Sequence, residues 1–257
     1  PVKTRYCRIG DESREPTAVI MGDSHANRLF DGISPHFSAV GGNLLQIGEG
    51  GCAPLWNVYG GAAGSPDQCF ERLNQQIEYR TRAEAISIVF LVSRVTLYMT
   101  GRGHGSVENG THTFLTHSVK SDLKYKDAFE LGFRDTVNKL IRSGKRVVLI
   151  IDNPELGFDP LSCIGLRPWQ FKSTILKTCG VLREKVDERN KEYVDFINRL
   201  ALEFNTIKII DSKKALCDSK YCWAIANGNL LYMDGDHLNQ FGAAKVAGLI
   251  PKEIFLQ

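Results

Sequence analysis

Two short segments near the ends of the chain carry side chains that could form a nucleophile, its base and an orienting acid. Residues 22–25 read Gly-Asp-Ser-His and follow an apolar run, while residues 234–237 read Asp-Gly-Asp-His. A serine hydroxyl is a weak nucleophile until a neighbouring base takes its proton. His237 could be that base, and Asp234, three residues earlier, could hold the imidazole in the correct tautomer. The pattern predicts covalent catalysis at Ser24.

The residues around Ser24 predict a position between a strand and a helix. Residues 17–21 are β-branched and apolar, which is typical of a strand buried on both faces. Gly22 permits a tight turn, and Asp23 or Ser24 could cap a helix from about 26 to 38. The N–H groups at the start of such a helix can bind a developing oxyanion. A plain capping role for Ser24 is the alternative.

The second segment has other readings besides catalysis. An Asp-Gly-Asp-His sequence also suits a turn or a metal-binding loop. We expect no metal, because no second His or Cys lies nearby in the sequence to complete a site. Asp23 and Asp236 are each more typical of a turn or a helix cap than of a catalyst, and His25 is expected to pack beside the nucleophile.

The rest of the chain alternates strand and helix patterns, which predicts a mainly parallel sheet with helices on both faces. Besides 17–21, the expected strands are 43–47, 85–92, 146–151 and 207–210. The expected helices after the first are 70–82, 124–143, 181–204 and 242–250. We therefore predict an α/β fold, a three-layer α/β/α sandwich around a central, mainly parallel sheet of about five strands.

Candidate binding residues follow several of the expected strands. A parallel sheet places the ends of its strands along one edge, where ligands bind. Ser24 and Gly51 follow the first two strands, and Arg94 follows the third. Arg94 has only donors and a permanent charge, so it could bind an oxyanion or a sugar hydroxyl, with a structural ion pair as the alternative. Asn153 is a second candidate for substrate binding, with a turn residue as the alternative, and the Gly-rich loop 99–121 could cover the acceptor site.

The motifs resemble those of the SGNH, or GDSL-type, hydrolases over most of the chain, from about 17 to 256. Residues 22–25 look like the first motif block of that family. Residues 234–238 with Gly242 look like its last block, and the order along the chain is the one that the family requires. The resemblance implies the SGNH hydrolase fold, which is flavodoxin-like.

The resemblance also implies a role for each candidate residue. The catalytic triad would consist of Ser24, Asp234 and His237. The oxyanion hole would use the N–H groups of Ser24 and Gly51, with Gly50 as the alternate. The family places an asparagine at the end of the third strand, where this chain has Ser93 and Arg94. Arg94 is the expected substitute for that oxyanion donor, and Asn153 is a second candidate for the role.

A narrower resemblance involves residues 51–55, Gly-Cys-Ala-Pro-Leu, and the pair Cys217 and Cys222. These are similar to the periplasmic SGNH domains of bacterial cell-surface O-acetyltransferases, most of all the O-antigen O-acetyltransferases. In those proteins the domain follows a multi-span acyltransferase (family three) membrane domain. The resemblance implies an acetyl donor delivered by that fused domain, a polysaccharide acceptor, and a periplasmic location in an inner-membrane protein.

The resulting hypothesis is a serine-dependent O-acetyltransferase that passes an acetyl group through Ser24 to a sugar hydroxyl, without a cofactor. If water takes the acetyl group instead, the same site is a carbohydrate acetylesterase. A non-catalytic carbohydrate-binding domain that keeps the fold is a further alternative. Phosphate or nucleotide binding at residues 48–51 is disfavoured, because the Lys of a P-loop and the spacing of a dinucleotide fingerprint are both missing.

Composition and charge set the remaining expectations. The chain has 257 residues and a net charge of +3, with Lys and Arg scattered among acids, which gives no case for nucleic acid as a partner. Its apolar runs are too short to span a membrane. The chain begins at Pro1 rather than Met, so we expect a piece of a longer protein. Residues 1–16 would be a linker from a preceding membrane domain, and 17–257 the SGNH catalytic domain.

Seven cysteines raise the question of disulfides. Cys217 and Cys222 are close enough for a small loop, and larger loops could be closed by the pairs Cys52–Cys69 and Cys163–Cys179. Sequence alone does not fix the connectivity, and free buried cysteines are the alternative. The periplasmic resemblance favours disulfides, which persist in oxidising compartments, and Cys7 is then left over.

Overall fold

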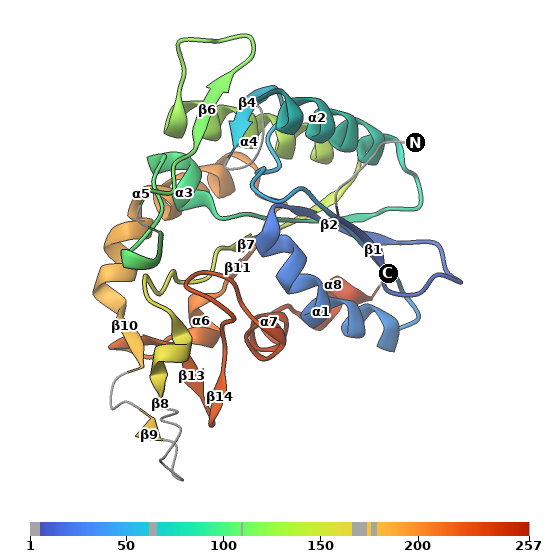
Figure 1. The fold of residues 1–257 in the computed structure, drawn as a ribbon. Helices are drawn as coiled ribbons and strands as arrows, with labels where there is room; N and C mark the ends of the chain where they lie inside the picture. The colour runs from blue at the N-terminus through green and yellow to red at the C-terminus, as the bar shows by residue number, and fades with distance from the viewer. Residues whose placement is uncertain (1–5, 62–65, 109, 166–173, 176–178, 257) are drawn as a thin grey trace.

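The computed structural model describes residues 6–61, 66–108, 110–165, 174–175 and 179–256. Its centre is a six-stranded sheet (Figure 1). The strand order is β1 (Tyr6–Ile9), β3 (Leu44–Gly48), β2 (Ala18–Gly22), β5 (Ile88–Val92), β7 (Arg146–Ile151) and β11 (Lys208–Asp211). All neighbours from β3 to β11 pair in parallel. The predicted mainly parallel α/β fold is confirmed.

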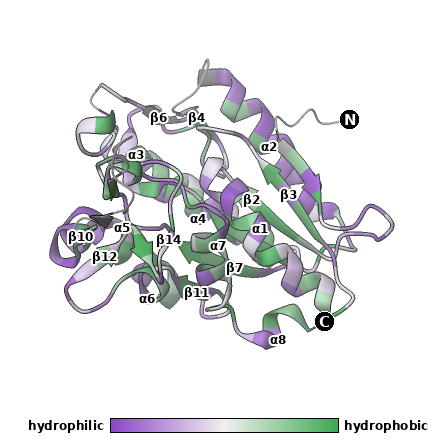
Figure 2. Ribbon diagram, turned by 60° about the horizontal axis from the view of Figure 1, so that its bottom comes forward, coloured by the Kyte–Doolittle hydropathy of each residue, from purple (hydrophilic) through white to green (hydrophobic). Residues whose placement is uncertain are grey.

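Apolar side chains on both faces explain why the sheet lies inside. Every residue of β2 and of β5 is buried. Because side chains alternate along a strand, Ile20 and Phe90 join a hydrophobic core on one face, and Met21 and Leu91 join a core on the other. Figure 2 shows hydrophobic residues in sheet strands such as β3 and many hydrophilic ones on the outer helix α2 (Pro66–Arg82).

Helices form the outer layers of the sandwich (Figure 1). The core that contains Ile20 is covered by α1 (Ser24–Ala39), α6 (Lys213–Leu216), α7 (Gln240–Ala247) and α8 (Lys252–Phe255). The opposite core is covered by α2, α3 (Val95–Thr100), α4 (Tyr125–Arg142) and α5 (Arg183–Glu203). Helices α1 and α7 approach closely at Gly32, where an added Cβ would lie 2.4 Å from the carbonyl oxygen of Ala243.

Short elements surround this frame. The antiparallel pairs are β4 (Val58–Gly61) with β6 (Phe114–His117), β8 (Ile164–Gly165) with β9 (Thr174–Ile175), β10 (Gly180–Leu182) with β12 (Tyr221–Trp223), and β13 (Ile225–Ala226) with β14 (Asn229–Leu230). The 3₁₀ turns are η1 (Ser106–Glu108) and η2 (Pro160–Cys163). Among the helices in the described ranges, none combines the length and the apolar character needed to cross a bilayer.

The N-terminal segment 1–16 is not a linker throughout, contrary to expectation. Residues 1–5 lie outside the described residues, but Tyr6–Ile9 form β1 and pair antiparallel with β3. The side chain of Arg8 also binds α1, with 2.9 Å between its Nη1 and Asp31 Oδ1. An antiparallel edge strand on an otherwise parallel sheet is common in α/β folds. The link from this segment to a membrane domain stays a prediction.

Three disulfides join the cysteine pairs considered from the sequence. They are Cys52–Cys69, Cys163–Cys179 and Cys217–Cys222, while Cys7 is free and exposed. The alternative of free buried cysteines is therefore wrong for these six residues. Cys52–Cys69 ties the turn after β3 to α2, and that turn holds the expected oxyanion glycines.

The double variant Cys52→Ala/Cys69→Ala is expected to lower the free energy of unfolding by about 3 kcal/mol, because a loop spanning 17 positions is no longer closed in the unfolded chain. Urea denaturation followed by circular dichroism measures this change. Cys7→Ser is the control, since an exposed free thiol should matter by less than about 0.5 kcal/mol. A double variant as stable as Cys7→Ser would contradict the prediction.

Candidate active site

Ser24 is the first residue of α1, and one residue, Asp23, separates it from the end of β2. Strand β2 ends at Gly22, where an added Cβ would lie 1.7 Å from the carbonyl oxygen of Val92, so only glycine fits beside β5. Asp23 then caps the helix, with its Oδ1 accepting from the backbone N–H of His25 at 2.9 Å. This turn aims Ser24 away from the core at the carboxyl edge of the sheet, where the sequence predicted it.

The structure brings the three predicted triad residues together. Nε2 of His237 lies 2.7 Å from Oγ of Ser24. Nδ1 of the same ring lies 2.9 Å from Oδ2 of Asp234. Asp234 Oδ1 also accepts from the backbone N–H groups of Asp236 and His237, at 3.1 and 2.7 Å. The Asp234 side chain therefore fixes the backbone of the turn that carries His237.

The environment of His237 favours its protonated form. Partial burial by itself would lower the pKa of His237, but hydrogen bonds that its ring donates to Asp234 and Asp236 outweigh that effect and raise it above the usual histidine value. The charge of nearby His25 opposes this rise. A histidine with a raised pKa is a stronger proton acceptor, and its imidazolium form is stabilised.

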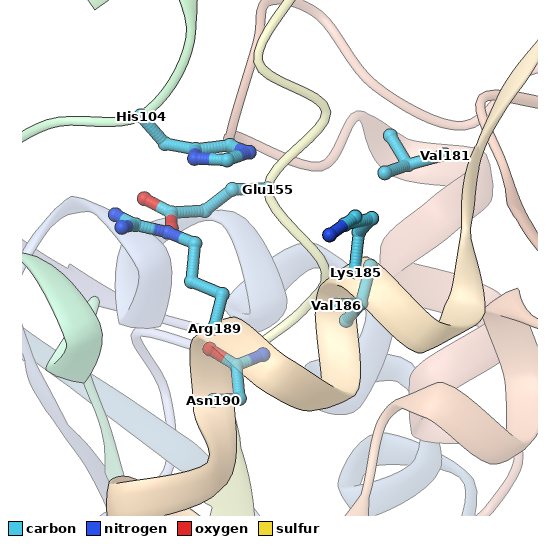
Figure 3. A pocket seen from close by; sticks show the side chains of 7 residues that line it. All are labelled: His104, Glu155, Val181, Lys185, Val186, Arg189 and Asn190. Atoms are coloured by element: carbon cyan, nitrogen blue, oxygen red, sulfur yellow. The ribbon is translucent and has the colours of Figure 1, made fainter.

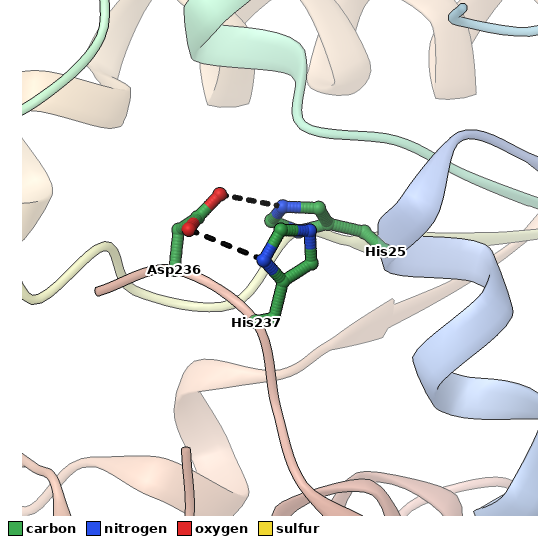
Figure 4. Close-up of side chains that lie close together, drawn as sticks. All are labelled: His25, Asp236 and His237. Carbon is green, nitrogen blue, oxygen red and sulfur yellow. Dashed lines mark hydrogen bonds and ion pairs between the residues drawn. The ribbon is translucent and has the colours of Figure 1, made fainter. Parts of the chain in front are cut away.

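Asp236 is a further member of the site that the sequence analysis assigned to a turn or cap. Its Oδ1 lies 3.3 Å from Nδ1 of His237, and its Oδ2 lies 3.2 Å from Nε2 of His25 (Figure 4). The same Oδ2 lies 3.0 Å from Nη1 of Arg94. Burial would raise the pKa of Asp236, but the two histidines hold it well below the usual carboxyl value.

His25 also does more than pack beside the nucleophile. Its ring centroid lies 4.8 Å from that of His237, and its Nδ1 lies 2.7 Å from Oδ1 of Asp152. The side chain is buried, which would lower its pKa, but Asp152 and Asp236 raise the pKa well above the usual value. His25 therefore lies buried between Asp152 and Asp236, an arrangement that favours its protonated form.

The same cluster raises the question of a metal ion. The sequence offered no second histidine near residues 234–237, but the fold supplies His25, and ligand atoms of His25, Asp236 and His237 lie within 4.8 Å of one another. However, Nη1 of Arg94 lies 3.0 Å from the Asp236 oxygen that also faces His25. A guanidinium at this oxygen competes with a metal cation, so the donor set fits hydrogen bonding better than metal binding.

The glycines expected in the oxyanion hole follow β3. The backbone N–H of Glu49 donates to the carbonyl of Gly22 at 3.0 Å, which places this turn beside the segment that carries Ser24. Gly51 has φ of 75°, a conformation that favours glycine. The carbonyl of Gly51 faces Cys69. The roles of Gly51 and of its alternate Gly50 stay predictions.

Arg94 has a different environment from the expected one. Its backbone N–H donates to Asp23 Oδ2 at 2.9 Å. Its guanidinium binds Glu155 through Nε at 2.7 Å, Glu108 through Nη1 at 2.6 Å and Asp236 at 3.0 Å. Because these carboxylates occupy its donors, the structure does not support Arg94 as an oxyanion or substrate ligand. It is a buried structural ion pair, the alternative that the sequence left open.

Asn153 likewise binds neighbouring loop residues rather than facing an open substrate site. Its Nδ2 donates to the backbone carbonyl of Asp236 at 2.6 Å, and its N–H donates to Asp152 at 2.9 Å. The side chain is buried. Asn153 therefore fixes the backbone next to His237, and the expectation that it binds substrate is not supported.

Part of the loop expected to cover the acceptor site does lie next to the triad. Val107 of η1 would be 2.9 Å from a Cβ added to Gly235, and the N–H of Leu156 donates to the Gly235 carbonyl at 2.7 Å. The segment between Asp234 and Asp236 is thus held between two loops. These contacts define one rim of the site.

The ion pairs continue behind Arg94 into a small recess (Figure 3). There Glu155 lies between His104 and Arg189 of α5, and Arg189 Nε binds the second carboxylate oxygen of Glu155. Burial would raise the pKa of Glu155, but Arg189 and Arg94 lower it. This network places Arg94 and Arg189 against the carboxylates of Glu108, Glu155 and Asp236 next to the triad.

Comparison with known proteins adds a family match. The sequence model of the family described as "SGNH domain (fused to AT3 domains)" matches residues 1–252. No curated protein sequence matches the chain.

Solved structures share the fold. The periplasmic domain of the lipopolysaccharide acetyltransferase of Salmonella ser. Paratyphi A is 20% identical and superposes with a TM-score of 0.61, covering 93% of this chain and 84% of the other. The acetyl xylan esterase AlAXEase is 17% identical, with a TM-score of 0.50 over 90% of this chain and 96% of the other. These similarities establish the SGNH hydrolase fold.

Proposed function

The chain belongs to the family of SGNH domains that are fused to AT3 domains, and we propose from this premise that it is a serine-dependent carbohydrate O-acetyltransferase domain. The observation that carries the proposal is the 2.7 Å contact between Ser24 Oγ and His237 Nε2, with Asp234 on the other ring nitrogen. A serine in this arrangement loses its proton to the imidazole as it attacks an ester carbonyl.

The first half of the reaction acetylates Ser24. Its Oγ attacks the acetyl carbonyl of the donor while His237 Nε2 takes the hydroxyl proton. The N–H groups of Ser24 and Gly51 stabilise the oxyanion of the tetrahedral intermediate. The bond to the donor oxygen then breaks, and the imidazolium gives its proton to the leaving group.

The second half transfers the acetyl group. A sugar hydroxyl gives its proton to His237 Nε2 and attacks the acetyl-Ser24 carbonyl. Collapse of the intermediate breaks the bond to Ser24, which regains the proton from the imidazolium. The product is the O-acetylated sugar, and the enzyme returns to its starting state without a cofactor.

The family and the sequence resemblance support a proposed donor and a proposed acceptor of the acetyl group. Because family members are fused to AT3 domains, we propose that such a membrane domain delivers the acetyl group to Ser24. The acceptor would be a hydroxyl of an O-antigen-like surface polysaccharide. The lipopolysaccharide acetyltransferase of Salmonella, whose periplasmic domain shares the fold, supports a surface glycan as the acceptor. Three disulfides suit a periplasmic location of this domain in an inner-membrane protein.

An acetylesterase is the second candidate, because the same triad serves either acceptor. The His237 side chain is 21% exposed, so water can reach the base and replace the sugar. A non-catalytic carbohydrate-binding domain has less support, because binding alone does not require a serine–histidine hydrogen bond.

Intact-mass spectrometry after exposure to p-nitrophenyl acetate tests the proposal. The wild-type domain is expected to gain the mass of one acetyl group, and Ser24→Ala is expected to gain none. Ser38→Ala, which removes an exposed serine from the same helix, should label like the wild type. Adding sugar acceptors should then shorten the lifetime of the acetyl-enzyme and yield an acetylated sugar.

Two outcomes would contradict parts of the proposal. If Ser24→Ala labels like the wild type, Ser24 is not the nucleophile. If the acetyl-enzyme decays to acetate at the same rate with and without sugars, and no acetylated sugar forms, the esterase is favoured over the transferase.

A further inference from the structure

Asp234, the proposed acid of the triad, is open to water. The side chain of Asp234 is 49% exposed, whereas that of Asp236 is 7% exposed. Water screens the attraction between an exposed carboxylate and a cation, and burial strengthens it. We therefore expect that Asp234 is not the only carboxylate with a strong electrostatic influence on His237.

Asp236 has the geometry to act on the same ring nitrogen. Its Oδ1 is 3.3 Å from Nδ1 of His237, while Asp234 Oδ2 is 2.9 Å from that nitrogen. A single N–H can be shared between two acceptors at such distances. Asp236 also lies two residues after Asp234, with Gly235 between them.

Three side chains hold Asp236 in this place. Nε2 of His25 and Nη1 of Arg94 face its Oδ2, at 3.2 and 3.0 Å. Asn153 fixes its backbone carbonyl through a 2.6 Å hydrogen bond. The permanent charge of Arg94 favours the ionised carboxylate, and both contacts leave its Oδ1 to face His237.

A continuous chain of polar contacts results. It runs from Ser24 through His237, Asp236 and His25 to Asp152, with contact distances of 2.7, 3.3, 3.2 and 2.7 Å. His25 follows Ser24 directly in the sequence. The residue beside the nucleophile thus orients the acid that faces the catalytic base.

We propose that Asp236 is a second positioning carboxylate for His237, oriented by His25 and Arg94, and that it shares the Nδ1–H of His237 with Asp234. The inference rests on the proposed function in one respect, since it assigns His237 as the catalytic base. When His237 accepts the proton of Ser24, both carboxylates stabilise the imidazolium. Loss of either one leaves the other in place.

The variants Asp234→Asn and Asp236→Asn, alone and combined, test this sharing. Asparagine at 234 keeps the oxygen that accepts from the backbone of residues 236 and 237. NMR titration of the His237 ring gives its pKa, and hydrolysis of p-nitrophenyl acetate gives kcat/KM. The charged groups that face His237 are Asp234, Asp236 and His25. Asp195→Asn is the matched control, because its side chain is 47% exposed, like that of Asp234.

Each single variant is expected to lower the pKa of His237 and to reduce kcat/KM by about tenfold. The double variant should lose about ten-thousand-fold, far more than the product of the two single effects, as when the only acid of a triad is removed. Asp195→Asn should change neither the His237 pKa nor kcat/KM.

The proposal would be overturned if Asp234→Asn alone lost as much activity as the double variant, or if a folded Asp236→Asn left the His237 pKa unchanged. If substitution at 236 prevents folding, the Asp234→Asn variant still tests the proposal. This variant must then keep at least about a hundredth of the wild-type kcat/KM. Its His237 pKa must also stay above the usual histidine value. The NMR titration also separates this proposal from the proposed function. It reports whether Asp234 and Asp236 both act on His237 even if Ser24 proves not to be the nucleophile.

Discussion

The His237→Ala variant is expected to hydrolyse p-nitrophenyl acetate with a kcat/KM about ten-thousand-fold below that of the wild type. His237 Nε2 is the group within 2.7 Å of Ser24 Oγ that can take its proton, and removing the base of a serine triad leaves only oxyanion stabilisation and binding. Initial rates over a range of ester concentrations separate kcat from KM. We expect the loss to fall on kcat, because the ester does not need His237 to bind.

The dependence of kcat/KM on pH should show that His237 acts in its neutral form. The base must be neutral to accept a proton, and the pKa of His237 is raised by Asp234 and Asp236 despite its burial. The wild-type kcat/KM should therefore increase with pH and level off only above that raised pKa, later than for an ordinary histidine. His237→Ala should lack this rising limb.

His36→Ala is the control for this experiment. His36 is an exposed histidine on α1, the helix that begins with Ser24, and the variant should keep the wild-type rate and pH profile. Equal activity of His237→Ala and His36→Ala would exclude His237 as the base, and with it the proposed mechanism.

The central part of the fold could be predicted because its signals are local. Residues 18–22 and 146–151 are apolar runs of strand length, and they form β2 and β7 almost as predicted. Strand β1 was missed because Tyr6–Ile9 pair along one edge only and lie among charged residues. Its partner β3 lies about forty positions further along the chain, and no local pattern encodes that pairing.

The proximity of Ser24, His237 and Asp234 could be predicted because their residue types and order are typical of one kind of chemistry. The network around them could not, because its members converge from distant segments. Asp236 contacts His25 across 211 positions, and His25 contacts Asp152 across 127. Each of these residues alone resembles a turn or cap residue, and Arg94 alone resembles a free donor. Only the fold shows that their charges face one another.

The Arg94→Met variant tests whether that charge network stabilises the fold. Its free energy of unfolding is expected to fall by about 3–5 kcal/mol, because removing one partner of a buried ion pair leaves charges uncompensated. The carboxylates of Glu108, Glu155 and Asp236 would all lose this cation. Urea denaturation at pH 8 measures the change.

Arg199→Met is the matched control, since Arg199 forms an ion pair with Glu130 at 3.0 Å but its side chain is 54% exposed. An ion pair of this kind contributes about 0–1 kcal/mol. A similar small loss for both variants would show that the pairs of Arg94 do not stabilise the fold.

Acidification should reduce the deficit of Arg94→Met. In the wild type, Arg189 and Arg94 lower the pKa of Glu155 against the effect of burial, so its stabilising contribution is present above the usual glutamate pKa and is lost as the pH falls through the lowered one. In the variant, burial raises that pKa relative to the wild type, and protonation removes an uncompensated charge. The difference in unfolding free energy between variant and wild type should therefore be smaller at about pH 5 than at pH 8. A deficit that is the same at both pH values would mean that Arg94 acts through packing of its side chain rather than through its charge.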